Sequence, residues 1–140
     1  MEIANRLARL YAGIVSVVQD HAPTEAAVEA PFLGVSARSA LQLAHARGVV
    51  LAVLGFSGLP VFEYSPATIK KAVTGNGRAE KEQVGAMVSR LVAGRCPPGK
   101  PDIADAIAAA LCHLFAAGHA DALRRAEVLR RPRSGEPRRS

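Results

Sequence analysis

The stretch Lys100-Pro101-Asp102-Ile103-Ala104-Asp105-Ala106 opens a helix that is predicted to continue through His113. Asp102 and Asp105 would be neighbours on one face of that helix, where two like charges are unfavourable. Two explanations fit this pairing. Acidic side chains in a first helical turn are stabilised by the helix dipole, without any ligand. Alternatively, the carboxylates hold a divalent cation such as Mg²⁺, which binds oxygen ligands, and a third acid then comes from elsewhere in the chain.

The third acid is Glu29, in the stretch Glu25-Ala26-Ala27-Val28-Glu29-Ala30-Pro31. The stretch is short, mostly apolar and stopped by a proline, which predicts a buried strand over residues 26–31. A carboxylate near the carboxyl end of a buried strand is unfavourable unless it is paired or liganded, and ligands of open α/β sheets bind at that end. The alternative is an edge strand with Glu29 directed to water.

The residues that follow predict a βαβ unit. Ser36 is a suitable N-cap for a long helix over residues 36–56, and a second strand is expected over residues 61–64. Ser65 and Pro66 then start a helix through Val73. A strand, a helix and a strand in this order indicate a parallel sheet and an α/β fold. The second half of the long helix is apolar nearly all round, which places it in the core or against a second subunit.

Two further helices complete the predicted domain. Residues 2–20 carry apolar side chains at intervals of three and four, typical of a helix with one buried stripe, and residues 79–93 repeat that pattern. A chain of 140 residues is expected to form one domain, here residues 1–120, followed by a basic, disordered tail over residues 121–140.

Targeting and redox features are few. The longest stretches without Asp, Glu, Lys or Arg, residues 48–62 and 106–120, are shorter than a membrane span, and the N-terminus lacks the features of a signal peptide. We therefore expect a cytoplasmic protein with no membrane partner. Cys96 and Cys112 have no metal-binding spacing and are expected to be ordinary thiols.

The charge is unevenly distributed along the chain. Most of the net charge of +6 belongs to the C-terminal tail, but residues 30–101 also hold nine basic and three acidic side chains. A basic middle with a few grouped acids suits metal chemistry on a polyanion, whereas the alternative is scattered solubilising charge. Arg78 and Lys81 lie at the expected start of a helix, where they either bind phosphate or are simply solvated.

Several blocks together resemble RuvC, a family of crossover junction endodeoxyribonucleases, in the order and at the spacing of that family. The blocks are Glu25-Ala26-Ala27-Val28-Glu29-Ala30-Pro31-Phe32, Ala44-His45-Ala46-Arg47-Gly48-Val49, Leu59-Pro60-Val61-Phe62-Glu63-Tyr64, Ile69-Lys70-Lys71-Ala72-Val73-Thr74-Gly75-Asn76-Gly77-Arg78-Ala79-Glu80-Lys81 and Asp102-Ile103-Ala104-Asp105-Ala106. Each block is weak alone, but jointly they are specific over residues 5–115.

The resemblance implies a ribonuclease-H-like fold, a homodimer, and nicking of two opposed strands of a Holliday junction in DNA recombination and repair. It further implies two Mg²⁺ ions for each active site, with Mn²⁺ as a substitute, and RuvA and RuvB, the branch-migration complex, as partners. It identifies Glu29, Asp102 and Asp105 as catalytic metal ligands. The candidate DNA-binding residues are Phe32, Arg38, Lys70, Arg78 and Lys81.

The chain also departs from the family pattern. Val35-Ser36 replaces a basic residue and Asn, and His45 replaces Gln, which affects local DNA contacts. The family begins with a strand that carries a first catalytic Asp, followed by two more strands; we expect the present chain to lack them and to retain two strands and about five helices. Three functions stay open: a junction-resolving nuclease, a junction-binding protein that does not cut, and a helical interaction protein with a basic tail.

Overall fold

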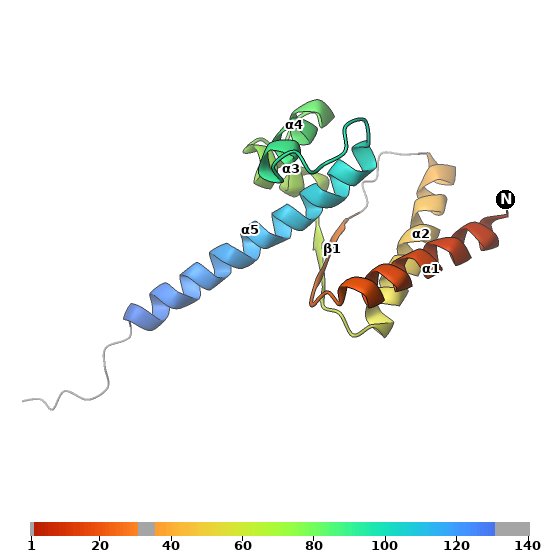
Figure 1. Cartoon of the computed structure of the whole chain (residues 1–140), viewed down its shortest axis with the longest axis horizontal. Coiled ribbons are helices and arrows are strands. Elements are labelled where there is room, and N and C mark those ends of the chain that lie inside the picture. Colours follow the sequence, from red (N-terminus) through yellow and green to blue (C-terminus); the bar gives the residue numbers. More distant parts are fainter. Residues whose placement is uncertain (1, 31–35, 131–140) are drawn as a thin grey trace, which may run out of the picture.

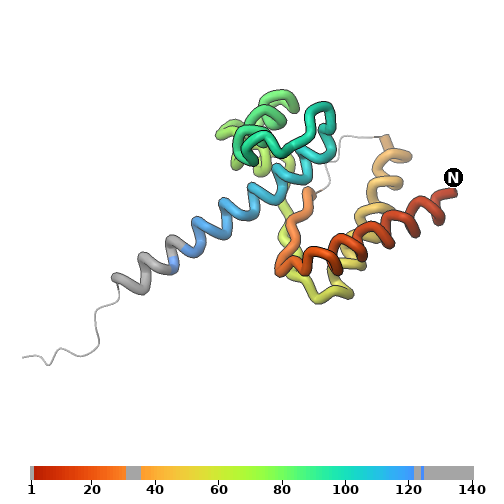
Figure 2. Tube along the Cα trace, viewed as in Figure 1, coloured from red at the N-terminus to blue at the C-terminus, as the bar shows by residue number. Residues whose placement is uncertain are grey.

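The computed structural model describes residues 2–30 and 36–130, which form five helices and two strands (Figure 1). The elements are α1 (Ile3–His21), β1 (Ala26–Glu29), α2 (Ala37–Phe56), β2 (Val61–Tyr64), α3 (Pro66–Thr74), α4 (Lys81–Leu91) and α5 (Pro101–Arg130). This is the predicted α/β element order. Figure 2 shows the chain passing from α1 and α2 on one side of the strands to α3, α4 and α5 on the other.

The two strands are parallel, as the βαβ pattern predicts. Their register pairs Ala26 with Val61 and Glu29 with Tyr64, and α2 is the crossover helix. Because side chains alternate across a strand, Glu29 lies on the same face as Phe62 and Tyr64, both of which contact α5. Glu63 lies on the opposite face, which α2 covers. Glu29 is therefore at the carboxyl end of β1 and on the face of α5.

Local sequence signals set most helix ends. The hydroxyl groups of Ser36 and Ser65 accept hydrogen bonds from the backbone N–H three residues on, and Pro66 occupies the start of α3. Helix α4 is shorter than the predicted range of residues 79–93. Glu80 is its N-cap and forms a capping box with Gln83, which moves the start to Lys81. At the other end Ala93 adopts a left-handed conformation (φ 54°), which ends the helix.

The core lies between α3, α4 and α5. Its buried members form one cluster around Val88, which has no exposed surface: Ile69, Val73, Ala79, Val84, Val88, Ala104, Ala108, Ala109 and Cys112. The alanines of α5 let the neighbouring helices approach it closely. This packing fixes the N-terminal part of α5, and with it the position of Asp105.

Helices α1 and α2 form a second layer that buries much less. None of the residues of α1 is buried, so the predicted stripe is only half covered where α1 packs on α2. In α2 only Val53 and Leu54 are buried, while Leu41, Leu43 and Phe56 are exposed. Both buried residues belong to the apolar second half of α2, which is therefore partly covered, whereas the first half exposes Leu41 and Leu43.

Two helices, α2 and residues 101–121 of α5, are long and apolar enough to cross a membrane when judged by length and composition alone. The uncharged stretches of the sequence are too short to predict these two helices as possible spans, because Arg47 interrupts α2 and Asp105 interrupts α5. In α5 the apolar side chains pack against α3 and α4. The same composition is therefore explained there by a core helix.

Helix α5 also runs further than the sequence suggests, to Arg130 (Figure 1). Residues 121–130, which we assigned to the tail, continue the helix because nothing between Ala120 and Arg130 breaks it. Residues 131–140 lie outside the described residues. The division into a domain over residues 1–120 and a tail stays a prediction.

Candidate metal and phosphate site

A cleft opens at the carboxyl end of β1, between that strand and helices α3, α4 and α5. Its volume is about 210 Å³. Its walls include two acids and two lysines, Glu29, Asp105, Lys70 and Lys81, over an apolar floor that includes Ile69 and Val84. Ile69 and Val84 also belong to the buried core, so the helices that carry the charged side chains are held in fixed positions.

Separate elements deliver the two acids. Glu29 is the last residue of β1 and is directed toward α5 by the strand alternation described above. Asp105 lies just beyond the first turn of α5, between the buried residues Ala104 and Ala108. Within the described part of the chain neither carboxylate forms an ion pair. Both are therefore available to a ligand from the cleft.

Asp102 does not share this position. It lies in the first turn of α5, is exposed and does not line the cleft. Among the described residues, no three His, Cys, Asp or Glu side chains are grouped closely enough to hold a metal ion together. The structure thus brings together Glu29 and Asp105 and leaves Asp102 one helical turn away, so the three-acid metal site stays a prediction.

The two acids in the cleft nevertheless fit a hard divalent cation. Carboxylate oxygens are the ligands that Mg²⁺ prefers, and Mg²⁺ is usually bound by only one or two carboxylates, with water and substrate phosphate filling the remaining positions. Glu29 and Asp105 would hold the ion, and the cleft is open to both water and phosphate.

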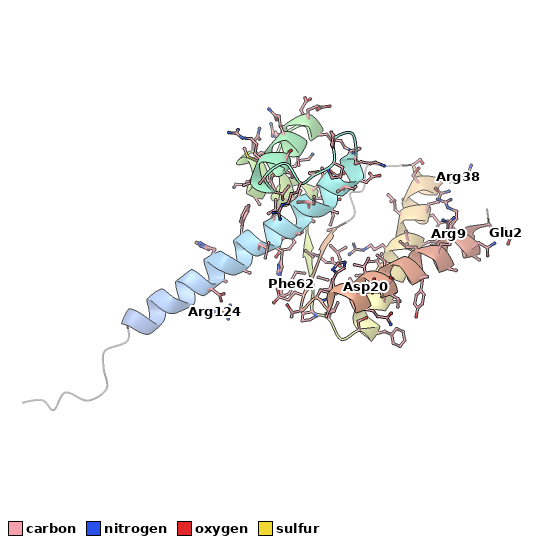
Figure 3. The ribbon with its side chains drawn as sticks, in the orientation of Figure 1. Glu2, Arg9, Asp20, Arg38, Phe62 and Arg124 are labelled. Atoms are coloured by element: carbon pink, nitrogen blue, oxygen red, sulfur yellow. The ribbon has the colours of Figure 1, made fainter. Side chains whose placement is uncertain are left out.

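The basic residues divide into two groups. Lys70, half-buried in α3, and Lys81, the first residue of α4, line the cleft beside the acids. Arg78 lies in the turn before α4, where its backbone N–H is bound by the side chain of Asn76, and it does not line the cleft. Arg38 is exposed at the start of α2, also outside the cleft (Figure 3). Phe32 lies outside the described residues.

A larger hollow of about 760 Å³ adjoins the cleft and shares Lys81 and Asp105 with it. It lies between α4 and the loop that leads into α5, and its lining includes Ser89 and Lys100. The hollow thus extends the cleft toward α4 and the loop before α5, and Lys81 and Asp105 border both spaces.

Two polar contacts near the site were missed by the sequence analysis. The first is Arg47 of α2, whose guanidinium donates a 3.0 Å hydrogen bond to the backbone carbonyl of Glu29 and forms an ion pair with Glu63. Arg47 belongs to residues 44–49, one of the stretches that resemble RuvC, but the sequence alone assigned it no role. An arginine inside a mostly apolar helix was a signal that could have been used, because such a group needs a partner.

The second contact joins β2, α5 and the start of β1 through His113. Its Nδ1 lies 2.6 Å from the Tyr64 hydroxyl and its Nε2 lies 2.5 Å from a carboxylate oxygen of Glu25. Phe62 stacks on the ring at a centroid distance of 4.4 Å. His113 is only 9% exposed, and this network satisfies both of its nitrogens. These contacts give His113 a structural role, because it joins β2, α5 and the residue before β1.

Burial also affects two groups next to this network. It raises the pKa of the Tyr64 hydroxyl, with smaller contributions in the same direction from Cys112 and Glu25. It likewise raises the pKa of the Cys112 thiol. Cys112 and Cys96 are both free thiols, as expected.

Comparison with known proteins supports the identification from sequence blocks. The family model described as crossover junction endodeoxyribonuclease RuvC matches residues 1–113. The RuvC of Paramagnetospirillum magneticum is 48% identical over 124 residues, which cover 89% of this chain and 74% of that protein. The RuvC of Nitratidesulfovibrio vulgaris is 50% identical over 113 residues, or 81% of this chain and 68% of that one.

Solved structures agree with the fold. A Thermus thermophilus RuvC structure superimposes with a TM-score of 0.77 at 32% identity, covering 86% of this chain and 72% of that one. A second structure, T. thermophilus RuvC in complex with Holliday junction substrate, gives a TM-score of 0.75 at 30% identity, with coverages of 85% and 73%. The predicted ribonuclease-H-like fold class is thereby confirmed, and the chain belongs to the RuvC family of crossover junction endodeoxyribonucleases.

Proposed function

We propose that this chain is a structure-selective endonuclease that nicks four-way DNA junctions by metal-dependent hydrolysis of a phosphodiester. The observation that carries the proposal is the cleft in which Glu29 and Asp105 face the same space as Lys70 and Lys81. Two acids suit a divalent cation and two lysines suit a phosphate, so the cleft can hold both at once.

Each residue has a part in the proposed reaction. Glu29 and Asp105 hold the cation, while Lys70 and Lys81 offset the negative charge of the phosphate. When bound, Mg²⁺ would activate the attacking water and stabilise the leaving oxygen. The water oxygen bonds to phosphorus and gives up a proton to solvent, the bond from phosphorus to the leaving strand oxygen breaks, and that oxygen takes up a proton from solvent. Asp102 would serve a second cation, and Mn²⁺ would replace Mg²⁺.

Further features of the proposal depend on the family resemblance and on the second helical layer. The exposed apolar side chains of α1 and α2 support a homodimer, in which two clefts act on two strands. Phe32, Arg38 and Arg78 would contact the junction outside the cleft. RuvA and RuvB are proposed as partners from the resemblance alone. A cytoplasmic location is proposed because the cellular DNA on which the protein would act lies there.

One observation favours a second function, junction binding without cutting. The position of Asp102 outside the cleft leaves two acids there, and two-metal cleavage relies on ligands for both ions. A protein with this site would bind the junction through its basic residues without cutting it. The same experiment separates the two functions.

The experiment is a cleavage assay on a synthetic four-way junction with Mg²⁺ or Mn²⁺. Glu29→Gln and Asp105→Asn should each lower the cleavage rate by at least about 100-fold, since losing even a residue that only supports a metal ligand costs 10- to 100-fold. Asp20→Asn, an equivalent change on the exposed surface of α1, should have no effect. Junction binding measured without metal should persist in all variants.

The outcomes are distinct. Cleavage by the unmodified chain that survives Glu29→Gln and Asp105→Asn would contradict the site. Selective junction binding with no cleavage under either metal would favour the second function. Equal binding to a four-way junction and to a linear duplex would contradict both.

A further inference from the structure

Arg47 of α2 lies outside the cleft, but its side chain contacts the strand that carries Glu29. We propose that Arg47 is a positioning residue: its guanidinium fixes the carboxyl end of β1 and so holds the Glu29 carboxylate toward Asp105. The inference rests on the proposed role of Glu29 as a metal ligand. It assigns a role to a residue on the opposite side of the sheet from the cleft.

The backbone of β1 shows why its end needs support. Ala26 and Ala30 donate hydrogen bonds to the carbonyls of Pro60 and Tyr64, so alternate residues of β1 direct their backbone groups to β2. The carbonyl of Glu29 therefore faces away from β2. Among the described residues β1 pairs with β2 alone, so the hydrogen bond to the Glu29 carbonyl comes from a side chain and not from a strand.

Arg47 satisfies that carbonyl. One guanidinium nitrogen, Nη1, donates to the carbonyl oxygen of Glu29 at 3.0 Å, while Nη2 binds the carboxylate of Glu63 on the neighbouring strand. The arginine thus connects the end of β1, β2 and helix α2 through one rigid planar group. Lysine carries the charge but lacks the fork that binds two partners in fixed directions.

The faces of the sheet separate this role from direct catalysis. Glu63 and Arg47 lie on the face of α2, whereas the side chain of Glu29 lies on the face of α5 with the cleft. Arg47 does not line the cleft, so it acts on Glu29 through the backbone. The Arg47 side chain is 21% exposed and that of Glu63 is 48% exposed, so water competes for the ion pair mainly at the Glu63 carboxylate.

The test compares Arg47→Ala, Arg47→Lys and Glu63→Gln with Gln42→Ala, a control at an exposed position of the same helix. Three quantities are measured: Mn²⁺ binding without DNA by electron paramagnetic resonance, the melting temperature, and junction cleavage. Arg47→Ala should weaken Mn²⁺ binding by about 10-fold, because groups that orient a metal ligand contribute about 10- to 100-fold to affinity. Arg47→Lys should be intermediate, and Glu63→Gln, which keeps an oxygen acceptor, should have the smallest effect.

A purely structural arginine would give a different pattern. The melting temperature would fall, but below it each folded variant would bind Mn²⁺ and cleave junctions as the unmodified chain does, and this result would overturn the proposal. If Arg47→Ala does not fold, Arg47→Lys and Glu63→Gln decide by the same measure. Mn²⁺ binding that depends on Arg47 in a chain without cleavage would contradict the nuclease function alone, whereas an unmodified chain that binds no Mn²⁺ would contradict both.

Discussion

The helices on the two faces of the sheet have similarly apolar sequences but bury them very differently. On one face α3, α4 and α5 enclose a continuous cluster of buried side chains around Val88. On the other face α1 has no buried residue, and α2 keeps Leu41 and Leu43 exposed. Apolar content alone therefore does not say what a helix packs against.

The residues of the candidate site are held in place by different layers. Asp105, Lys70 and Lys81 belong to the helices of the well-packed layer, so their positions are set by the core. Glu29 belongs to a short strand whose end is held by Arg47 of the loosely packed layer. The geometry of the cleft thus depends on both layers, and an exposed apolar face as long as that of α2 is typical of an interface.

The same charge placed in each layer should have very different effects on folding. Val88→Asp should prevent folding, because an unpaired carboxylate in the core costs more than about 4 kcal/mol. Val17→Asp, at a position 54% exposed in α1, should leave the fold intact. Circular dichroism melting curves measure both. Unfolding by Val17→Asp, or normal melting of Val88→Asp, would show that the layers do not differ as described.

The predictions that succeeded were those with local signals. Ser36, Ser65 and Pro66 mark helix starts by side-chain hydrogen bonding or by a fixed backbone angle. A short, mostly apolar stretch before Pro31 predicted β1, so the α/β order could be derived from neighbouring residues. Glu29 was correctly placed at the carboxyl end of its strand, but the prediction of a buried strand was wrong: residues 26–28 are half-buried and Glu29 is exposed. The strand–helix–strand pattern then gave the parallel pairing.

The remaining features depend on contacts between distant residues. The spacing of Asp102 and Asp105 could not show that only Asp105 faces the cleft, because that depends on how α5 rotates against α3 and α4. The partners of Arg47 and His113 come from other elements, far away in the sequence. The helical state of residues 121–130 was missed because composition, rather than helix continuity, was used to define the tail.

The second prediction tests what covers the loosely packed layer. Leu43 is 58% exposed in α2, so Leu43→Glu should fold normally. If α2 forms the proposed dimer interface, a buried glutamate there should cost about 2 kcal/mol or more, which raises the dimer dissociation constant at least about 30-fold. Sedimentation equilibrium measures it. Gln42→Glu adds the same charge at a polar position and should change association less; a monomeric unmodified chain at tens of micromolar would contradict the interface.

The third prediction compares one tyrosine from each layer. Tyr64→Phe removes the hydroxyl at Nδ1 of buried His113. Because Nε2 is already engaged by the Glu25 carboxylate, Nδ1 is left without a hydrogen-bond partner. The free energy of unfolding should fall by about 1 to 3 kcal/mol. Tyr11→Phe, at an exposed position of α1, should change it by less than about 0.5 kcal/mol. Urea denaturation distinguishes them, and equal small changes would show that the His113 network does not stabilise the packed layer.

The smallest expected effect is an alkaline loss of stability that arises only in the packed layer. Burial raises the pKa values of Tyr64 and Cys112 in the folded protein, so the unfolded chain loses these protons first. Below about pH 8.5 both groups are protonated in both states and contribute no pH dependence; above it the unfolded state is increasingly favoured, as a free thiol and then a free phenol ionise near about 8.5 and 10. The melting temperature should therefore fall between about pH 8.5 and 10.5, and less steeply for Tyr64→Phe combined with Cys112→Ala.

The matched control is Tyr11→Phe combined with Cys96→Ala, which removes a phenol and a thiol that are both more exposed. It should keep the slope of the unmodified protein, because it leaves Tyr64 and Cys112 in place. If the melting temperature falls with pH equally steeply in all three proteins, folding does not raise the pKa values of Tyr64 and Cys112.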